Sequence, residues 1–349
     1  MSTHRLHGLD FSRAVLMVLG LFFHAGLIYG DVQGWRVLSE HNSIYLQFFS
    51  NFIHQFRMEA FYIISGIFYY LVLAKNRDGF LKDRVSRALI PLLFVGILIN
   101  PIMNVFSYNR DYELNFSHIL DGDWLGHLWF LGNLIIYFIV SVPVCRLIAK
   151  LEPLNTKQFL LLSLTIFTIG ILGKVFSKLF LNFTFVFISF ESLFYFYSYF
   201  LIGIIAYKNI KSFNSLLSLK YIPIFLLVYF SFVTSSFFLL SINSNISKLL
   251  GLIAHLPIVI VVLSLLTYIG SNESKLIRWF SDASYTIYLL HQPLLVIFYF
   301  FIFKELQFNP YTEYFLLIFI VFSLSLLFHF LLIKRHKVLK LLFNGIPLR

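Results

Sequence analysis

The sequence predicts an all-α fold, a polytopic membrane helix bundle of about ten transmembrane helices with cytoplasmic N- and C-termini. Three observations support this prediction. Apolar residues make up 59% of the chain and charged residues only 12%, whereas soluble domains average roughly half and a quarter. Apolar runs that reach the roughly 20 residues needed to cross a bilayer recur along the whole chain. Lysine and arginine gather in alternate connections between these runs.

Each apolar run defines one expected helix. The first is too long for a cleaved signal peptide, and no small-residue cleavage site follows it. The longest connections are 31–55 and 108–125, and the second is acidic, as expected of an exported loop. No linker or repeat divides the chain, so residues 1–349 are expected to form one integral membrane domain. The expected spans are 11–30, 56–74, 88–107, 126–145, 159–177, 184–206, 221–241, 249–269, 283–303 and 313–333.

The distribution of positive charge predicts the orientation. Twenty of the 27 lysine and arginine residues fall on the side that holds the N-terminus, the 75–87 and 146–157 connections and the C-terminal tail. Cytoplasmic connections are enriched in these residues, so this side is expected to be cytoplasmic. The net charge of +11 is explained by this asymmetry and by attraction to anionic membrane lipids. No nucleic-acid partner is needed to account for it.

The first run carries three ionisable residues, with Asp10 and Arg13 at its start and His24 well inside. Eleven residues of α-helix turn through about 1100°, so Arg13 and His24 share a face, about 16 Å apart along the axis. An interhelical hydrogen bond would explain His24, and a membrane anchor paired with Asp10 would explain Arg13. The functional alternatives are a general base and a phosphate contact. A ligand shaped like acyl coenzyme A would reach both residues.

The second helix is expected to present several polar residues. His54 and Ser65 are eleven residues apart and are expected to share a face, with Arg57 one turn from His54. Ser65 and Gly66 also suit close helix packing. Arg57 suits either the outer membrane interface or the binding of an anionic or hydroxyl-rich acceptor. Glu59 is expected to lie on another face of the helix and therefore needs a hydrogen-bonding or charged partner of its own.

Two further motifs contain candidate residues. Trp129, in HLWFL, is either an aromatic-belt residue or a platform for a sugar ring. His291, in YTIYLLHQPLL, is followed by Pro293. A proline there removes a backbone hydrogen bond and frees a carbonyl beside the histidine. His291 is therefore either structural or functional.

Three other residues are expected to be structural, and one further acid needs a partner. Cys145 is the only cysteine, which excludes an intramolecular disulfide and a cysteine metal cluster. His255 and His329 are assigned structural roles, and Glu191 is expected to be a buried acid that needs a partner. No two histidines have the spacing of a helix-borne metal site, so no metal is expected.

Taken in order, these motifs resemble those of the acyltransferase-3 family of integral membrane acyltransferases over nearly the full length of the chain. The resemblance lies in LDFSRAVLMVLGLFFH, with its arginine–ten residues–histidine spacing, and in FYIISGIF, HLWFL and ASYTIYLLHQPL. Further similarity, in FIHQFRMEAFYIISG and KLLFNGIP, is to members associated with succinylation of periplasmic glucans. The resemblance implies transfer of an acyl group, succinyl favoured and acetyl possible, from cytoplasmic acyl-CoA to hydroxyls of an extracytoplasmic glucan or other carbohydrate.

The resemblance also implies roles for individual residues. His24 is the candidate general base, Arg13 a contact for the phosphates of CoA, and Asp10 the residue that orients Arg13. No permanently bound cofactor is expected, because acyl-CoA is a cosubstrate, and the expected location is the bacterial cytoplasmic (inner) membrane. The candidate substrate-binding or supporting residues are His54, Arg57, Ser65, Trp129 and His291.

Two other function classes stay open. A transporter or flippase of a saccharide-linked or acylated lipid fits ten helices and buried charges equally well, and a catalytically silent subunit of a polysaccharide machine is a third possibility. No pair of matching broken helices, which would indicate a transporter, is evident. The shared face of Arg13 and His24 favours an enzyme. Without an evident serine or cysteine nucleophile, we expect direct transfer in a ternary complex.

Overall fold

The structure is a computed structural model, and within the residues that it describes ten helical spans are long and apolar enough to cross a membrane. This confirms the predicted all-α membrane bundle. A hairpin of two-residue strands, β1 (Thr184–Phe185) and β2 (Ile188–Ser189), pairs antiparallel before α9. The described residues are 6–30, 35–75, 78–107, 122, 124–181, 184–185, 188–272, 274–306 and 308–346. The acidic connection predicted at 108–125 lies largely outside them.

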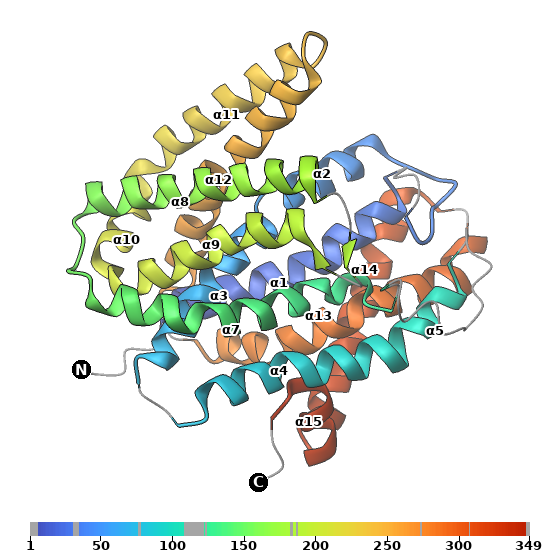
Figure 1. Cartoon of the computed structure of the whole chain (residues 1–349). Coiled ribbons are helices and arrows are strands. Elements are labelled where there is room, and N and C mark those ends of the chain that lie inside the picture. The colour runs from blue at the N-terminus through green and yellow to red at the C-terminus, as the bar shows by residue number, and fades with distance from the viewer. Residues whose placement is uncertain are drawn as a thin grey trace.

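The helices follow one another along the chain and mostly run side by side (Figure 1). Short π-helical or 3-10 segments extend several of them, such as η1 (Val95–Ile99) between α4 and α5 and η5 (His329–Ile333) after α14. The α-helices are α1 His7–Ile28, α2 Ile44–His54, α3 Arg57–Leu73, α4 Phe80–Phe94, α5 Asn100–Val105, α7 Trp129–Lys150, α8 Thr156–Phe180, α9 Phe190–Lys208, α10 Ile210–Leu216, α11 Ile222–Leu239, α12 Ser244–Ile269, α13 Lys275–Phe301, α14 Pro310–Phe328 and α15 Lys337–Asn344.

The structure differs from the prediction in the connection before the second predicted span. The sequence predicted a connection over 31–55, but residues Ile44–His54 form α2, and α3 begins at Arg57, within one residue of the predicted start. Because the helix is interrupted at residues 55–56, His54 and Ser65 do not share the face of one continuous helix. The prediction that they do was wrong.

The sixth span also begins later than predicted. Residues 184–206 were expected to be helical, but α9 begins at Phe190, where the Ser189 side chain accepts a hydrogen bond from the backbone N–H of Ser192. A serine side chain in this position satisfies one of the free N–H groups of the first turn. The cap therefore fixes where the helix starts and leaves the preceding residues to the β-hairpin.

The bundle is built around α1, which packs against α2, α3, α12, α13 and α14. A close crossing joins α3 and α9, where a Cβ atom on Gly66 would lie 2.1 Å from the carbonyl oxygen of Phe200. Small residues let membrane helices approach closely, which confirms the packing role expected for Gly66. By contrast, α11 packs mainly on α12 and projects from the bundle (Figure 1).

Both ends of the described chain lie at the same end of the bundle. Gly8, in the first turn of α1, packs against the backbone of Thr267 at the end of α12, and Ser281 of α13 donates a hydrogen bond to the Asp10 carbonyl. Gly345, after α15, packs against the backbone of Arg87 in α4. We call this the terminal end of the bundle. Its assignment to the cytoplasm stays a prediction from charge.

Candidate active site

Three imidazole rings from three segments meet in the bundle. His24 belongs to α1, His127 to the 3-10 segment η2 (Gly126–Leu128), and His291 to α13. The ring centroids lie 5.1 Å apart for His24 and His291, 4.8 Å for His127 and His291, and 6.4 Å for His24 and His127. Two of these histidines were candidates from the sequence, and His127 was not. Among the described residues, no group of three or more acidic, histidine or cysteine side chains is arranged to hold a metal ion.

Two of the three rings are held by hydrogen bonds at Nδ1. The Gln292 Oε1 atom lies 2.8 Å from His127 Nδ1 and also accepts from the His127 backbone N–H at 3.0 Å. His291 Nδ1 lies 2.6 Å from the carbonyl oxygen of Tyr288. Since both oxygens only accept, each ring carries its proton on Nδ1 and keeps Nε2 as an acceptor. Neither Nε2 atom has a hydrogen-bond partner among the described residues.

His24 differs from the other two because it makes no hydrogen bond to any described residue, and its Nδ1 atom is buried. Aromatic packing holds its ring instead. The indole of Trp35 stacks on it with centroids 6.1 Å apart, and Phe23 meets it edge-on at 4.8 Å. The interhelical hydrogen bond that would make His24 a structural residue is therefore absent from the described part of the chain.

Arg57 is a buried cation beside this cluster. Its side chain is 7% exposed, which excludes the outer-interface role considered from the sequence. The guanidinium carbon lies 5.2 Å from the centre of the Phe23 ring, and no carboxylate of the described residues forms an ion pair with it. A Cβ atom on Gly20 would lie 2.6 Å from Arg57 Nη1 and 3.6 Å from His291 Nε2. A buried, unpaired charge is costly, so Arg57 is suited to bind an anionic or developing negative group.

A small cavity of about 80 Å³, the histidine cavity, is bordered by side chains from these elements. His54 and Trp129 line it together with His24 and His127 of the cluster, so the structure brings both candidates to the site. Trp129 thus borders a cavity, as the sugar-platform alternative requires. The lining residues are Phe23, His24, His54, Arg57, Met58, His127, Trp129, Phe130 and Tyr288.

A larger cavity of about 290 Å³, the basic pocket, lies at the terminal end of the bundle. Arg13 lines it, and its Nη2 atom lies 3.4 Å from Asp10 Oδ1, which confirms the predicted pairing. Ser65 lines the same pocket, away from His54. Two arginines that the sequence had assigned only to the charged cytoplasmic side, Arg84 and Arg87, also line it. Three arginines therefore line one pocket.

A narrow connecting cavity of about 10 Å³ lies between the two. It shares Met17, Phe61 and Phe130 with the basic pocket, and Phe130 with the histidine cavity. It also shares Arg57 and two other residues with the histidine cavity. The three spaces therefore follow α1 from Arg13 towards His24. Because α1 is continuous, the helix rise of about 1.5 Å per residue still puts these two residues about 16 Å apart along the axis.

Several residues of the site were missed from the sequence. His127 stood in the quoted HLWFL motif and Gln292 follows His291, but nothing in either motif indicated that the two would bond. Tyr288 holds His291 through its carbonyl and donates its hydroxyl to the His127 carbonyl at 2.9 Å. Arg84 and Arg87 were also missed as site residues. The one available signal for them was their i, i+3 spacing, which puts both arginines on one helix face.

The fold and these cavities define a multi-pass membrane protein with a buried polar centre. The family model for the acyltransferase domain of the acyltransferase-3 family matches residues 6–333. The chain therefore belongs to this family and is an integral membrane acyltransferase.

Similar curated proteins carry one name, glucans biosynthesis protein C. Those of Salmonella paratyphi B, Salmonella enteritidis and Salmonella gallinarum are each 30% identical over 374 aligned residues, covering 98% of this chain and 95% of the relative. No solved structure matches the chain.

Proposed function

We propose that this acyltransferase moves an acyl group, succinyl or alternatively acetyl, from cytoplasmic acyl-CoA to a hydroxyl of a glucan or another carbohydrate outside the bacterial cytoplasmic membrane. The single observation that carries the proposal is the series of cavities from the arginines of the basic pocket to the histidine cluster. The names of the relatives support a glucan as the acceptor. The positive charge of the terminal end supports its placement in the cytoplasm, where the donor is available.

The basic pocket suits the nucleotide end of the donor. Arg13, Arg84 and Arg87 line it, and guanidinium groups bind phosphate oxygens through paired hydrogen bonds. From there the thioester arm would pass along Met17 and Phe61 towards His24. The connecting cavity, at about 10 Å³, holds no more than about one water molecule. Donor binding therefore requires these apolar side chains to move aside.

In the proposed reaction, His24 takes the proton of the acceptor hydroxyl while the oxygen attacks the thioester carbonyl. The new acyl–oxygen bond replaces the acyl–sulfur bond, and the proton passes from His24 to the departing CoA thiolate. The Arg57 guanidinium would stabilise negative charge on the carbonyl oxygen as it develops. General-base help of this kind is worth about 10²–10⁴-fold in rate. The mechanism needs no covalent acyl-enzyme.

The test is acyl-CoA consumption by the purified full chain in lipid nanodiscs. The protein is supplied with succinyl-CoA or acetyl-CoA, with and without a glucotetraose, and both free CoA and the mass of the sugar are measured. We expect CoA release that depends on the sugar and a sugar that gains the matching acyl group. A flippase would release no CoA, so the absence of acceptor-dependent release with either donor would contradict the proposal.

A further inference from the structure

A fourth cavity, of about 350 Å³, adjoins the histidine cavity and takes no part in the mechanism above. The two cavities share His54, Met58 and Trp129 as lining residues. Its volume falls within the roughly 300–1,000 Å³ typical of small-molecule sites. We call it the Glu59 cavity. Its lining residues are His54, Met58, Glu59, Trp129, Lys174, Ser189, Ser192, Tyr195, Phe196, Leu252 and His255.

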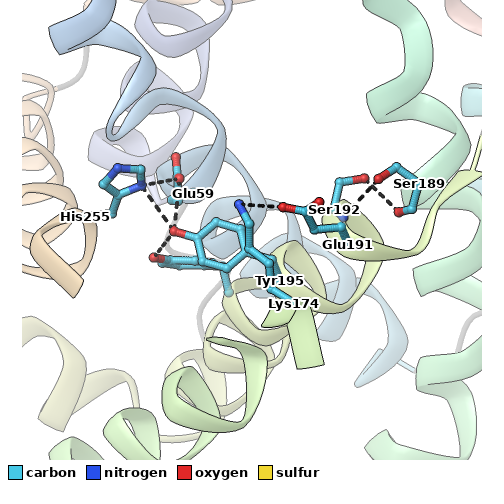
Figure 2. Close-up of polar contacts among 8 residues, drawn as sticks. Glu59, Lys174, Ser189, Glu191, Ser192, Tyr195 and His255 are labelled. Carbon is cyan, nitrogen blue, oxygen red and sulfur yellow. Dashed lines mark hydrogen bonds and ion pairs between the residues drawn. The ribbon is translucent and has the colours of Figure 1, made fainter. Parts of the chain in front are cut away.

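Glu59 lies at the centre of a hydrogen-bond network in this cavity (Figure 2). Its Oε1 atom lies 2.9 Å from His255 Nδ1 and accepts from the Tyr195 hydroxyl at 3.4 Å. The expectation that Glu59 needs its own partner is therefore confirmed. The Oε2 atom of this carboxylate, whose residue is only 2% exposed, has no hydrogen-bond partner among the described residues. A buried carboxylate oxygen without a hydrogen bond is costly in free energy unless a ligand or a water molecule donates one.

The same contact fixes the orientation of the His255 ring. A carboxylate oxygen accepts, so Nδ1 carries the proton that faces Glu59, and in the neutral imidazole Nε2 keeps its lone pair. A carboxylate holds imidazoles in this way where the far nitrogen must accept a proton or a hydrogen bond. The His255 side chain is 16% exposed and lines the cavity. His255, assigned a structural role from the sequence, thus presents an acceptor to a ligand.

The charge of the cavity favours a neutral ligand. Lys174 lies 3.6 Å from Glu191 and packs over the Tyr195 ring at 4.6 Å, so its charge is already paired (Figure 2). Glu191, expected to be buried, has a side chain that is 38% exposed and finds its partner in this lysine. With Glu59 added, the cavity has no surplus positive charge for a phosphate or a carboxylate.

The chemical groups that line the cavity favour a sugar ring as the ligand. Hydroxyl, imidazole and carboxylate groups lie beside the aromatic rings of Trp129 and Phe196, whose centroids are 5.6 Å apart. A sugar ring has polar edges and an apolar face, which match such a mixed lining. His255 lies in the first half of α12, whose other end packs Thr267 against Gly8. The cavity therefore lies away from the terminal end and the basic pocket.

We infer that the Glu59 cavity is the acceptor subsite, in which a neutral sugar ring lies against Trp129 and donates a hydroxyl hydrogen bond to His255 Nε2. The next sugar along the glucan would then pass His54, which lines both cavities, and present its reacting hydroxyl to His24. This inference rests on the proposed function, because it names where the acceptor of that reaction binds.

Binding and transfer test the inference separately. Binding of radiolabelled glucotetraose to the full chain in nanodiscs is measured by equilibrium dialysis without acyl-CoA, and transfer kinetics are measured with succinyl-CoA. The variants are His255→Asn, whose shorter amide can still donate to Glu59 but does not reach the position of Nε2, and Leu252→Phe, which adds volume at a lining residue that is not one of the Glu59 hydrogen-bond partners. The matched control is His329→Asn, because His329 bonds Thr286 at 2.8 Å and lines none of the four cavities.

Loss of one hydrogen bond to a buried polar group corresponds to about a tenfold change. The His255 variant should therefore raise the sugar Kd and KM about tenfold or more. Leu252→Phe should raise both constants because it takes space from the sugar, and the succinyl-CoA KM should change by less than about twofold in each variant. The control should match the wild-type protein. Wild-type sugar affinity in both variants, while transfer persists, would overturn the subsite alone. Variant-sensitive sugar binding without transfer from any acyl-CoA would overturn the proposed function alone, and neither binding nor transfer by the wild type would overturn both.

Discussion

The Gly20→Ala variant, which adds one methyl group to α1, tests the catalytic geometry at a crowded point. The new Cβ atom would lie 2.6 Å from Arg57 Nη1, and ordinary van der Waals contact begins at 3.4 Å. Arg57 must therefore retreat by about 0.8 Å from its place beside His291 Nε2. A misplacement of about 1 Å can cost an enzyme about 10²-fold in rate. We expect kcat to fall by about 10- to 100-fold.

Stability should change little in this variant. Alanine favours an α-helix over glycine by about 1 kcal/mol, which offsets part of the strain from moving one side chain. The matched control is Gly251→Ala in α12, where the nearest atom to the new Cβ is Ser236 Oγ at 3.7 Å. CoA release is measured for both variants, with thermal unfolding in nanodiscs as the check on folding. A Gly20→Ala protein with wild-type kcat would refute the catalytic placement of Arg57 beside the histidine cluster.

Two further predictions concern donor binding and packing. Arg84→Gln should raise the KM for acyl-CoA about tenfold or more and leave the KM for the sugar unchanged, because it removes one charge-assisted phosphate contact from the basic pocket. Equal effects on the two KM values would count against a donor site in this pocket. Gly66→Ala should lower the unfolding temperature strongly, since the new Cβ would lie 2.1 Å from the Phe200 carbonyl oxygen and must push α3 away from α9. Gly251→Ala again serves as control, and equal unfolding temperatures for the two variants would contradict the close crossing of α3 and α9.

The membrane fold was predictable because the bilayer imposes one simple rule on sequence. Ten apolar runs of bilayer length correspond to the ten spans found in the described part of the chain. The rule does not say where a helix breaks inside an apolar region. The break at residues 55–56, which separates His54 from Arg57, has neither proline nor glycine. The sequence therefore held no helix-breaking signal between α2 and α3.

Helix geometry could relate the candidate site residues to one another only where they share one helix. Arg13 and His24 lie on α1, so helix geometry alone related them. His127 and Gln292 are 165 residues apart, and Glu59 and His255 are 196 apart, so only packing between helices brings each pair together. Arg84 was ambiguous for another reason, because a cytoplasmic arginine satisfies the topology rule whether or not it also binds a ligand.

The central claim is that His24 takes the proton of the acceptor hydroxyl at the inner end of a donor passage. Acceptor-dependent CoA release by purified His24→Ala in nanodiscs, beside His329→Ala as a membrane-histidine control, tests this most directly. We predict that kcat falls by about 10²–10⁴-fold while the KM for acyl-CoA stays near the wild-type value, because Arg13, Arg84 and Arg87 are untouched. Wild-type turnover in His24→Ala would contradict the account.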